Sequence, residues 1–250
     1  MSELPEASET IRFWPATDVG RVRKANEDSF LVDKKLSLFI VADGMGGYEG
    51  GEVASQLTAT TMQAYYSRTS ESARSGKTLL EQAILTANAA VVAKRCGRLA
   101  QMGSTVAALM IEGDRVILGH VGDSRIYRMR DGVLEPRTRD HSLLAELEDS
   151  GADLACAAGF RHVVTRAIGM KQVTPQLRQE KLRPGDLYVL CTDGLSDKVD
   201  ADGIEFLLQT RSPGDACQTM VELAYELGGC DNITAVVLQV IHPEATGDCL

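Results

Sequence analysis

The order of apolar and polar positions predicts a chain in which short strands and helix pairs come in groups. Short apolar runs at residues 29–33 and 36–42, separated by two lysines, predict a hairpin of two strands. Apolar residues at helical spacing then predict two helices, from about 51 to 66 and from about 78 to 96. The polar segment between the two helices predicts a loop.

A dense region of strand patterns follows the helix pair. The candidates are residues 105–112, 116–121, 124–130 and 133–138. Turn residues separate them, and Asp131-Gly132 is a good two-residue hairpin turn. Short strands at this spacing favour an antiparallel sheet.

The last third of the chain begins with a mixed segment at 140–170, which we interpret as an excursion from the core that contains one helix at 141–150. A strand, two helices and a final strand are predicted at 186–192, 202–209, 215–227 and 232–241. This order does not alternate strand and helix, so a doubly wound parallel sheet is disfavoured. A sandwich of antiparallel sheets with helix pairs outside fits the pattern better.

Length and composition favour one domain. The chain has 250 residues, of which 44% are hydrophobic, and neither a linker nor an internal repeat interrupts the pattern. We predict a single domain over 11–242, with loose tails at 1–10 and 243–250. We also expect a monomer.

Charge and cysteine usage narrow the function classes. The formal net charge is −9, from 26 basic and 35 acidic residues, so nucleic acid is not an expected partner. The six cysteines form no CxxC pair, which disfavours structural zinc and suggests free thiols in a reducing compartment. No signal peptide or apolar membrane span is evident, so we expect a cytoplasmic protein without a membrane partner.

Five acidic sites carry the candidate chemistry. Four are aspartates beside a predicted strand and next to a glycine or another polar residue, and the fifth precedes the first predicted strand. They are Asp43, Asp123, Asp193, Asp231 and the pair Glu27-Asp28. A single Asp-Gly is commonly only a turn. Five such sites with almost no histidine nearby indicate an all-oxygen ligand set for a hard cation such as Mg²⁺ or Mn²⁺.

Six segments in this order resemble the PP2C-like (PPM) family of metal-dependent protein phosphatases, in its compact bacterial form. They are GRVRKANED at 20–28, VADGMGG at 41–47, GST at 103–105, GHVGDSR at 119–125, TDGLSD at 192–197 and DNIT at 231–234. The resemblance implies an α+β fold, an α-β-β-α sandwich of two antiparallel sheets flanked by helix pairs. It also implies that 140–170 contains a flap beside the active site.

The resemblance also implies a role for each matching residue. Asp43 would bridge two Mn²⁺ or Mg²⁺ ions and the Gly44 carbonyl would help to bind one. Asp193 and Asp231 would hold the other ion, with Glu27 and Asp28 beside the pair. Arg23 would contact the substrate phosphate, which makes Arg23, Asp43, Asp193 and Asp231 the expected catalytic residues. Asp123 and Asp197 match residues that bind a third metal in some relatives.

The implied reaction is hydrolysis of phosphoserine and phosphothreonine by a metal-bridging hydroxide. Eukaryotic relatives often have His after the first Asp-Gly as a proposed general acid, whereas this chain has Met45. The leaving-group acid is therefore unassigned. Among other residues near the motifs, we expect structural roles for His120 and His141, and we interpret Cys191 and Cys230 as small buried residues. His162 lies in the predicted flap.

Two alternatives stay open at this point. One is a catalytically weak signalling or binding module of the same fold, which the complete set of carboxylates argues against. The other is a small-molecule phosphomonoesterase, which the motifs do not separate from a protein phosphatase. The expected partners are phosphorylated proteins that are targets of a Ser/Thr kinase.

Overall fold

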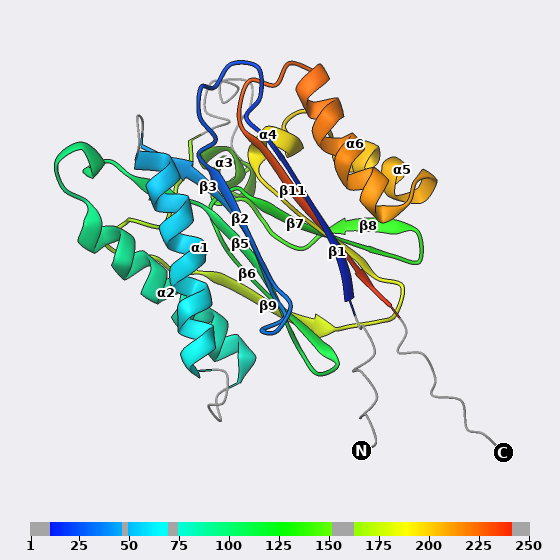
Figure 1. Cartoon of the computed structure of the whole chain (residues 1–250), viewed down its shortest axis with the longest axis horizontal. Helices are drawn as coiled ribbons and strands as arrows, with labels where there is room; N and C mark the ends of the chain where they lie inside the picture. The colour runs from blue at the N-terminus through cyan, green and yellow to red at the C-terminus, as the bar shows by residue number, and fades with distance from the viewer. Residues whose placement is uncertain (1–10, 47–49, 70–74, 152–162, 242–250) are drawn as a thin grey trace, which may run out of the picture.

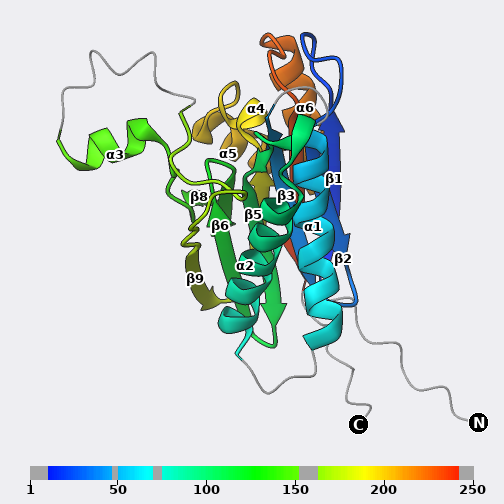
Figure 2. The same cartoon turned by 90° about the vertical axis from the view of Figure 1, so that its left-hand side faces the viewer.

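Two antiparallel sheets lie face to face in the computed structural model, with helices on both outer faces (Figures 1 and 2). The structure describes residues 11–46, 50–69, 75–151 and 163–241. The predicted tails and the middle of the predicted flap, with His162, lie outside these ranges. The predicted α-β-β-α sandwich is confirmed.

The first sheet has the strand order β1-β11-β10-β7-β8. Its strands are β1 (Ile11–Asp18), β7 (Arg125–Arg130), β8 (Val133–Pro136), β10 (Leu187–Cys191) and β11 (Ile233–Val240). The helices α4 (Asp193–Ser196), α5 (Ala201–Thr210) and α6 (Pro213–Glu226) follow β10 in the chain. The hairpin turn predicted between β7 and β8 is confirmed, because Asp131 and Gly132 both have positive φ, at 53° and 82°.

The second sheet has the order β2-β3-β5-β6-β9, with the short β4 paired to β3. Its strands are β2 (Asp28–Asp33), β3 (Leu38–Met45), β4 (Gly103–Ser104), β5 (Val106–Glu112), β6 (Arg115–Val121) and β9 (Gln176–Lys181). The helices α1 (Gly50–Thr69) and α2 (Gly76–Lys94) cover its outer face, η1 (Gly97–Leu99) follows α2, and α3 (Leu143–Asp149) lies in the predicted flap.

Strand alternation builds three buried layers. In β3, Leu38 and Ile40 pack with α1 and α2, whereas Phe39 and Val41 face the other sheet. The central strands of the first sheet divide in the same way, so that apolar side chains fill both faces of each sheet. Successive side chains of a strand point to opposite faces, and a strand covered on both sides therefore reads as a continuous apolar run.

Apart from the two-residue β4, two strands of the structure have no counterpart in the sequence prediction, β1 and β9. Both are edge strands, with a neighbour on one side only. β1 contains Pro15, and β9 has the sequence QLRQEK with mostly exposed side chains. Proline and polar residues are typical of sheet edges, where they weaken the apolar pattern that identifies central strands.

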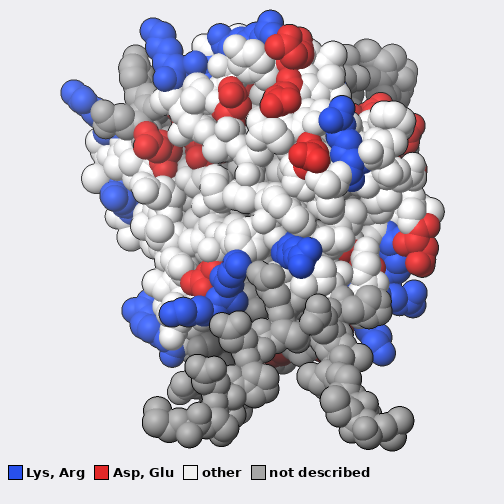
Figure 3. All heavy atoms as spheres, turned by 45° about the vertical axis from the view of Figure 1, so that its right-hand side comes forward, with Lys and Arg blue, Asp and Glu red and all other residues white. Residues whose placement is uncertain are grey.

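Two further features are the distribution of charge on the surface and the apolarity of the helices. On the face shown in Figure 3, basic and acidic side chains are interspersed rather than gathered into one field of either sign. In the parts of the chain that the structure describes, we find no helix of the length and apolarity that a bilayer span requires.

Candidate metal centre

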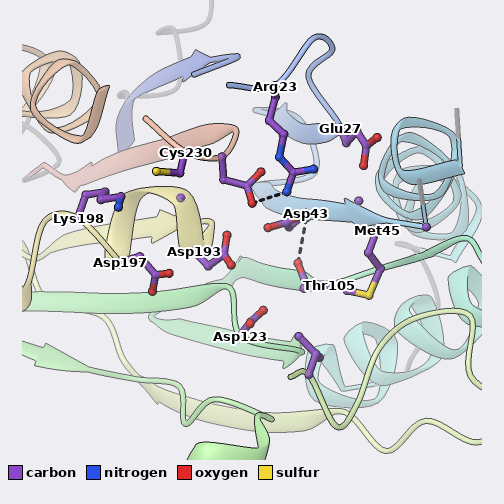
Figure 4. Close-up of a pocket in the computed structure, with 15 residues that line it drawn as sticks. Arg23, Glu27, Asp43, Met45, Thr105, Asp123, Asp193, Asp197, Lys198 and Cys230 are labelled. Carbon is purple, nitrogen blue, oxygen red and sulfur yellow. Dashed lines mark hydrogen bonds and ion pairs between the residues drawn. The ribbon is translucent and has the colours of Figure 1, made fainter. Parts of the chain in front are cut away.

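Strand ends from both sheets meet around one cavity of about 810 Å³ (Figure 4). All but one of the predicted site residues line this cavity: Arg23, Glu27, Asp43, Gly44, Asp123, Asp193, Asp197 and Asp231. The remaining one, Asp28, lies behind it. The fold thus gathers residues that are up to about two hundred positions apart in the sequence.

Asp28 and Asp43 are cross-strand partners in the β2–β3 ladder. Asp43 was expected to end its strand in a turn, but β3 continues to Met45 because Gly44 and Met45 pair with β4. Asp28 is almost fully buried, and its Oδ2 accepts a hydrogen bond of 2.8 Å from the Thr192 hydroxyl. Its Oδ1 has no hydrogen-bond partner among the described residues.

Thr105 fixes the backbone of Asp43. The Asp43 N–H donates to the Thr105 hydroxyl oxygen at 2.9 Å, and the Thr105 N–H donates to the Asp43 carbonyl at 2.8 Å. The Thr105 and Ser124 hydroxyl oxygens are 2.6 Å apart. Thr105 therefore ties the strand of Asp43 to the loop of Asp123. Sequence analysis placed Thr105 in a motif but gave it no role.

Asp193 begins α4, with Thr192 as the N-cap residue, so a short helix follows β10 directly. A side chain at Gly194 would not fit, because its Cβ would lie 1.9 Å from the Asn232 carbonyl oxygen. This close approach brings Asp193 next to the loop of Asp231. Glycine at this position is thus required by packing.

Asn232 holds three parts of the site together. Its side-chain amide donates to the carbonyls of Val19 and Ala25, and its side-chain oxygen accepts from the Glu27 N–H at 2.8 Å. Asn232 is buried, so these bonds are shielded from water. This residue fixes the loop that carries Arg23 and Glu27, a role that the sequence motif alone did not reveal.

Arg23 and Asp231 form an ion pair at the rim. The Arg23 guanidinium donates to Asp231 Oδ2 at 2.7 Å, and the two side chains are 47% and 35% exposed. Asp231 Oδ1 accepts from the Asn232 N–H at 2.8 Å. Glu27 lies beside Arg23 in Figure 4, and its carboxylate leaves no room for a Cβ at Gly51.

Burial and mutual repulsion raise the pKa values of the inner carboxyl groups. Burial raises the pKa of Asp28 to about 7, against hydrogen bonds from Thr234 and Thr192 that lower it. Burial, with the nearby Asp193 and Asp140, also raises the pKa of Asp123 to about 7. Burial and the charges of Asp28 and Asp193 raise the pKa of Asp43 well above its usual value. Bound cations would remove this repulsion.

The donor set fits divalent cations that prefer oxygen. The side chains that could ligate a metal are carboxylates. The buried Oδ1 of Asp28 has no hydrogen-bond partner among the described residues and could interact with a bound ion or its water. Across the described ranges, no three His, Cys, Asp or Glu side chains converge on one point as ligands. Mg²⁺ commonly binds through one or two carboxylates and keeps several waters, so a spread set of aspartates is compatible with it.

The two histidines near the motifs lie in the interior behind Asp123. Their rings stack with centroids 4.5 Å apart. His120 Nε2 donates to the Arg139 carbonyl at 2.8 Å, and His141 Nδ1 accepts from the Gly122 N–H at 3.2 Å. Neither lines the cavity. Asp197, in contrast, is exposed at the cavity rim.

The sulfur-containing residues divide between core and rim. Met45 lines the cavity. Cys191 is buried, as expected, but the expectation for Cys230 is wrong: its side chain is exposed and lines the cavity. Cys230 lies in the loop before β11, where its thiol faces the cavity. The described cysteines, at 96, 191, 217 and 230, are all free thiols.

A family model described as protein phosphatase 2C matches residues 21–224, which is most of the chain. The chain belongs to the protein phosphatase 2C family. The match contains the segments around Arg23, Asp43, Asp123 and Asp193, and ends before Asp231. The family resemblance inferred from the motifs is thereby confirmed.

Named relatives in the protein phosphatase 2C family include bacterial enzymes. The serine/threonine protein phosphatase PstP of Mycobacterium tuberculosis is 36% identical over 238 residues, which are 92% of this chain and 45% of PstP. The chain thus spans about half the length of this relative. The serine/threonine phosphatase stp of Listeria innocua is 31% identical over 236 residues, which are 89% of this chain and 93% of stp.

Solved structures of the protein phosphatase 2C family share the fold. The crystal structure of the PstP catalytic domain in complex with two manganese ions superposes with a TM-score of 0.82 at 36% identity. That match covers 93% of this chain and 99% of the other. The serine/threonine phosphatase of Streptococcus agalactiae gives a TM-score of 0.81 at 32% identity, covering 92% and 99%.

Proposed function

We propose that this chain is a metal-dependent protein serine/threonine phosphatase. The observation that carries the proposal is the cavity where carboxylates from both sheets surround a single space with one arginine at its rim. Membership of the protein phosphatase 2C family, and the two manganese ions in the PstP catalytic domain, support the same function.

The carboxylates that line the cavity, with Asp28 behind them, would hold two Mn²⁺ or Mg²⁺ ions. Asp43 would contribute to both, and the Gly44 carbonyl would help to bind one. Asp193 and Asp231 would hold the other, and Glu27 and Asp28 would support the pair directly or through water. When bound, such ions make a water molecule more acidic and offset charge on the phosphoryl group. Asp123 and Asp197, which lie on the Asp193 side of the cavity, are the residues for a third ion.

Arg23 would orient the substrate phosphate. Its planar guanidinium can donate two parallel hydrogen bonds to phosphate oxygens, which fixes the phosphorus relative to Asp43. Arg23 is half exposed, so a phosphorylated side chain can reach it from outside. Because Met45 has no proton to donate, a cavity water is the proposed source of the proton for the leaving oxygen.

The remaining features of the proposal concern the whole chain. We infer one catalytic domain over 11–242, because both sheets contribute to the cavity, with the flap at 140–170 beside it. Free thiols support a reducing, cytoplasmic location. Phosphorylated targets of a Ser/Thr kinase are the proposed substrates, and a monomer is the proposed state.

A phosphatase assay tests the proposal. The chain is incubated with Mn²⁺ or Mg²⁺, with and without chelator, on a phosphothreonine peptide and on a small phosphoester such as p-nitrophenyl phosphate. Metal-dependent release of phosphate from both substrates is expected. Turnover of the small ester alone would favour the small-molecule phosphomonoesterase. Metal binding by calorimetry without turnover on either substrate would favour the binding module and refute the enzyme.

A further inference from the structure

The cavity contains a second basic side chain besides Arg23. Lys198 lines it next to Asp197 and Cys230, two residues after α4 ends (Figure 4). Arg23 donates to Asp231, so part of its hydrogen-bonding capacity is already used. The Lys198 ammonium, in contrast, makes no hydrogen bond or ion pair with any residue that the structure describes. The Lys198 ammonium can therefore form an ion pair with an anionic group of a ligand.

The backbone and stem of Lys198 are held in place. Its N–H donates to the Leu195 carbonyl at 3.0 Å, and the next residue, Val199, is buried in the core. The side chain is half-buried and passes Gly228, where a Cβ would lie 4.0 Å from Cε and 3.8 Å from Nζ. A supported stem loses less conformational freedom when its charged end binds a ligand.

Lys198 is placed for a different anion from the one at Arg23. Figure 4 shows Lys198 beside Asp197 and Cys230 at one side of the carboxylates, with Glu27 and Met45 at the opposite side. Arg23 reaches in between these two sides. A single phosphate bound near Arg23 would therefore leave Lys198 to meet another part of the substrate.

The charge of the cavity makes this position selective. Six carboxylates line the cavity, and two divalent cations together with Arg23 and Lys198 would balance their charge. Away from Lys198, the exposed carboxylates would repel an acidic residue of the substrate. On the side of Lys198, the ammonium would attract it.

We propose that Lys198 is a specificity-determining residue that binds an anionic group flanking the phosphorylated Ser or Thr. The anionic group is a carboxylate or a second phosphate on the substrate chain, both of which a compact ammonium can bind. The proposal rests on the proposed phosphatase function. The chain then prefers acidic or doubly phosphorylated substrates.

The test compares phosphothreonine peptides that differ only in their flanks. One peptide has neutral flanks, a scanning set has one Glu at each position within three residues on either side, and a matched set has a second phosphothreonine there. The readout is the ratio of kcat/KM for each anionic peptide to kcat/KM for the neutral peptide. This ratio cancels any general change in activity.

The wild-type ratio is expected to reach about two- to fivefold for Glu on one side, and more for a second phosphothreonine. Lys198→Met keeps the stem and should bring the ratio to about one, and Lys198→Glu should bring it below one. Raising the salt concentration should shrink the wild-type ratio. Lys77→Met, which removes an exposed lysine at the start of α2, is the matched control and should leave the ratio unchanged.

Two results would overturn the assignment. The first is a ratio near one at every position in the wild-type chain. The second is a Lys198→Met variant whose kcat/KM falls equally for all peptides, which would give Lys198 a role at the metal site instead. Failure of the proposed function is distinct, because the wild-type chain would then release no phosphate from any peptide in the presence of Mn²⁺.

Discussion

The inner wall and the rim of the cavity hold the same kind of side chain in opposite environments. On the inner side, Asp28 lies behind the cavity wall and Asp123 lines the wall, and they are 9% and 8% exposed. Asp28 begins β2, and Asp123 follows β6 in the second sheet. At the rim, Asp231 is 35% exposed and already has Arg23 as a partner. We call the first group, with Asp43, the inner carboxylates and the second the rim.

This difference shows where electrostatic repulsion between the carboxylates is strongest. A buried carboxylate loses its hydration and feels neighbouring charges strongly, whereas water and salt screen a carboxylate at the surface. Repulsion is therefore concentrated among the inner carboxylates, where bound cations would offset it, whereas water screens the rim. Substitutions at the two places should have effects of different size and kind.

The largest effect is expected from Asp43→Asn. This change removes a charge that both ions would share, so phosphate release with Mn²⁺ should fall by about a thousandfold or more. The same change relieves repulsion, so the metal-free protein should melt at a higher temperature than the wild type. Steady-state kinetics and thermal unfolding measure the two results. Asp114→Asn, at an exposed position, is the control. An Asp43→Asn variant that kept its activity would show that Asp43 is not part of the metal centre.

The metal-free fold should lose stability as pH rises. Asp28 and Asp123 have pKa values raised from 3.8 to about 7, so the folded state binds protons that the unfolded state releases. The free energy of unfolding should therefore fall from about pH 4 to pH 7, by at most roughly 4 kcal/mol for each group.

Denaturant unfolding at several pH values, with chelator, measures this fall. Saturating Mn²⁺ replaces the protons, so the stabilisation by metal should grow over the same pH range. Metal-free stability that rises steadily from pH 4 to pH 7 would contradict the electrostatic account of the inner carboxylates.

Thr192→Val should weaken metal binding, although Thr192 is not itself a proposed metal ligand. The Thr192 hydroxyl donates to Asp28 and accepts from the Thr234 N–H at 3.1 Å, and valine has the same shape without these bonds. Loss of such a supporting bond typically lowers metal affinity by about 10- to 100-fold. Calorimetric titration with Mn²⁺ measures it. Thr60→Val, on the exposed face of α1, is the control, and equal affinities in both variants would show that Asp28 needs no support.

The smallest effect is expected at the rim, from Arg23→Lys. Lysine keeps the charge but offers no pair of parallel donors, so kcat/KM should fall by about tenfold. Metal affinity should change little, because water screens this position. Arg21→Lys is the control, since Arg21 pairs with Glu226 outside the cavity. A loss of Mn²⁺ affinity as large as that of Thr192→Val would place Arg23 with the inner group.

The sequence predicted the central strands of both sheets but only two of the four edge strands, β2 and β8. The strands β5, β6, β10 and β11 carry nearly continuous apolar runs, because both of their faces are covered. β1 and β9 lack that signal, since each is exposed along an edge. The course of β3 through Gly44 to Met45 was also missed, because it depends on pairing with β4, far along the chain.

What the sequence by itself determined was the set of candidate ligands and the fold class. Aspartates beside apolar runs, in family order, are local features that need no knowledge of packing. Only the tertiary structure decided how these residues differ from one another. Burial, the cross-strand pairing of Asp28 with Asp43, the bonds of Thr105 and Asn232, and the approach of Lys198 all depend on contacts between distant segments. The strength of an electrostatic interaction depends on distance and on exposure to water, and these contacts set both quantities.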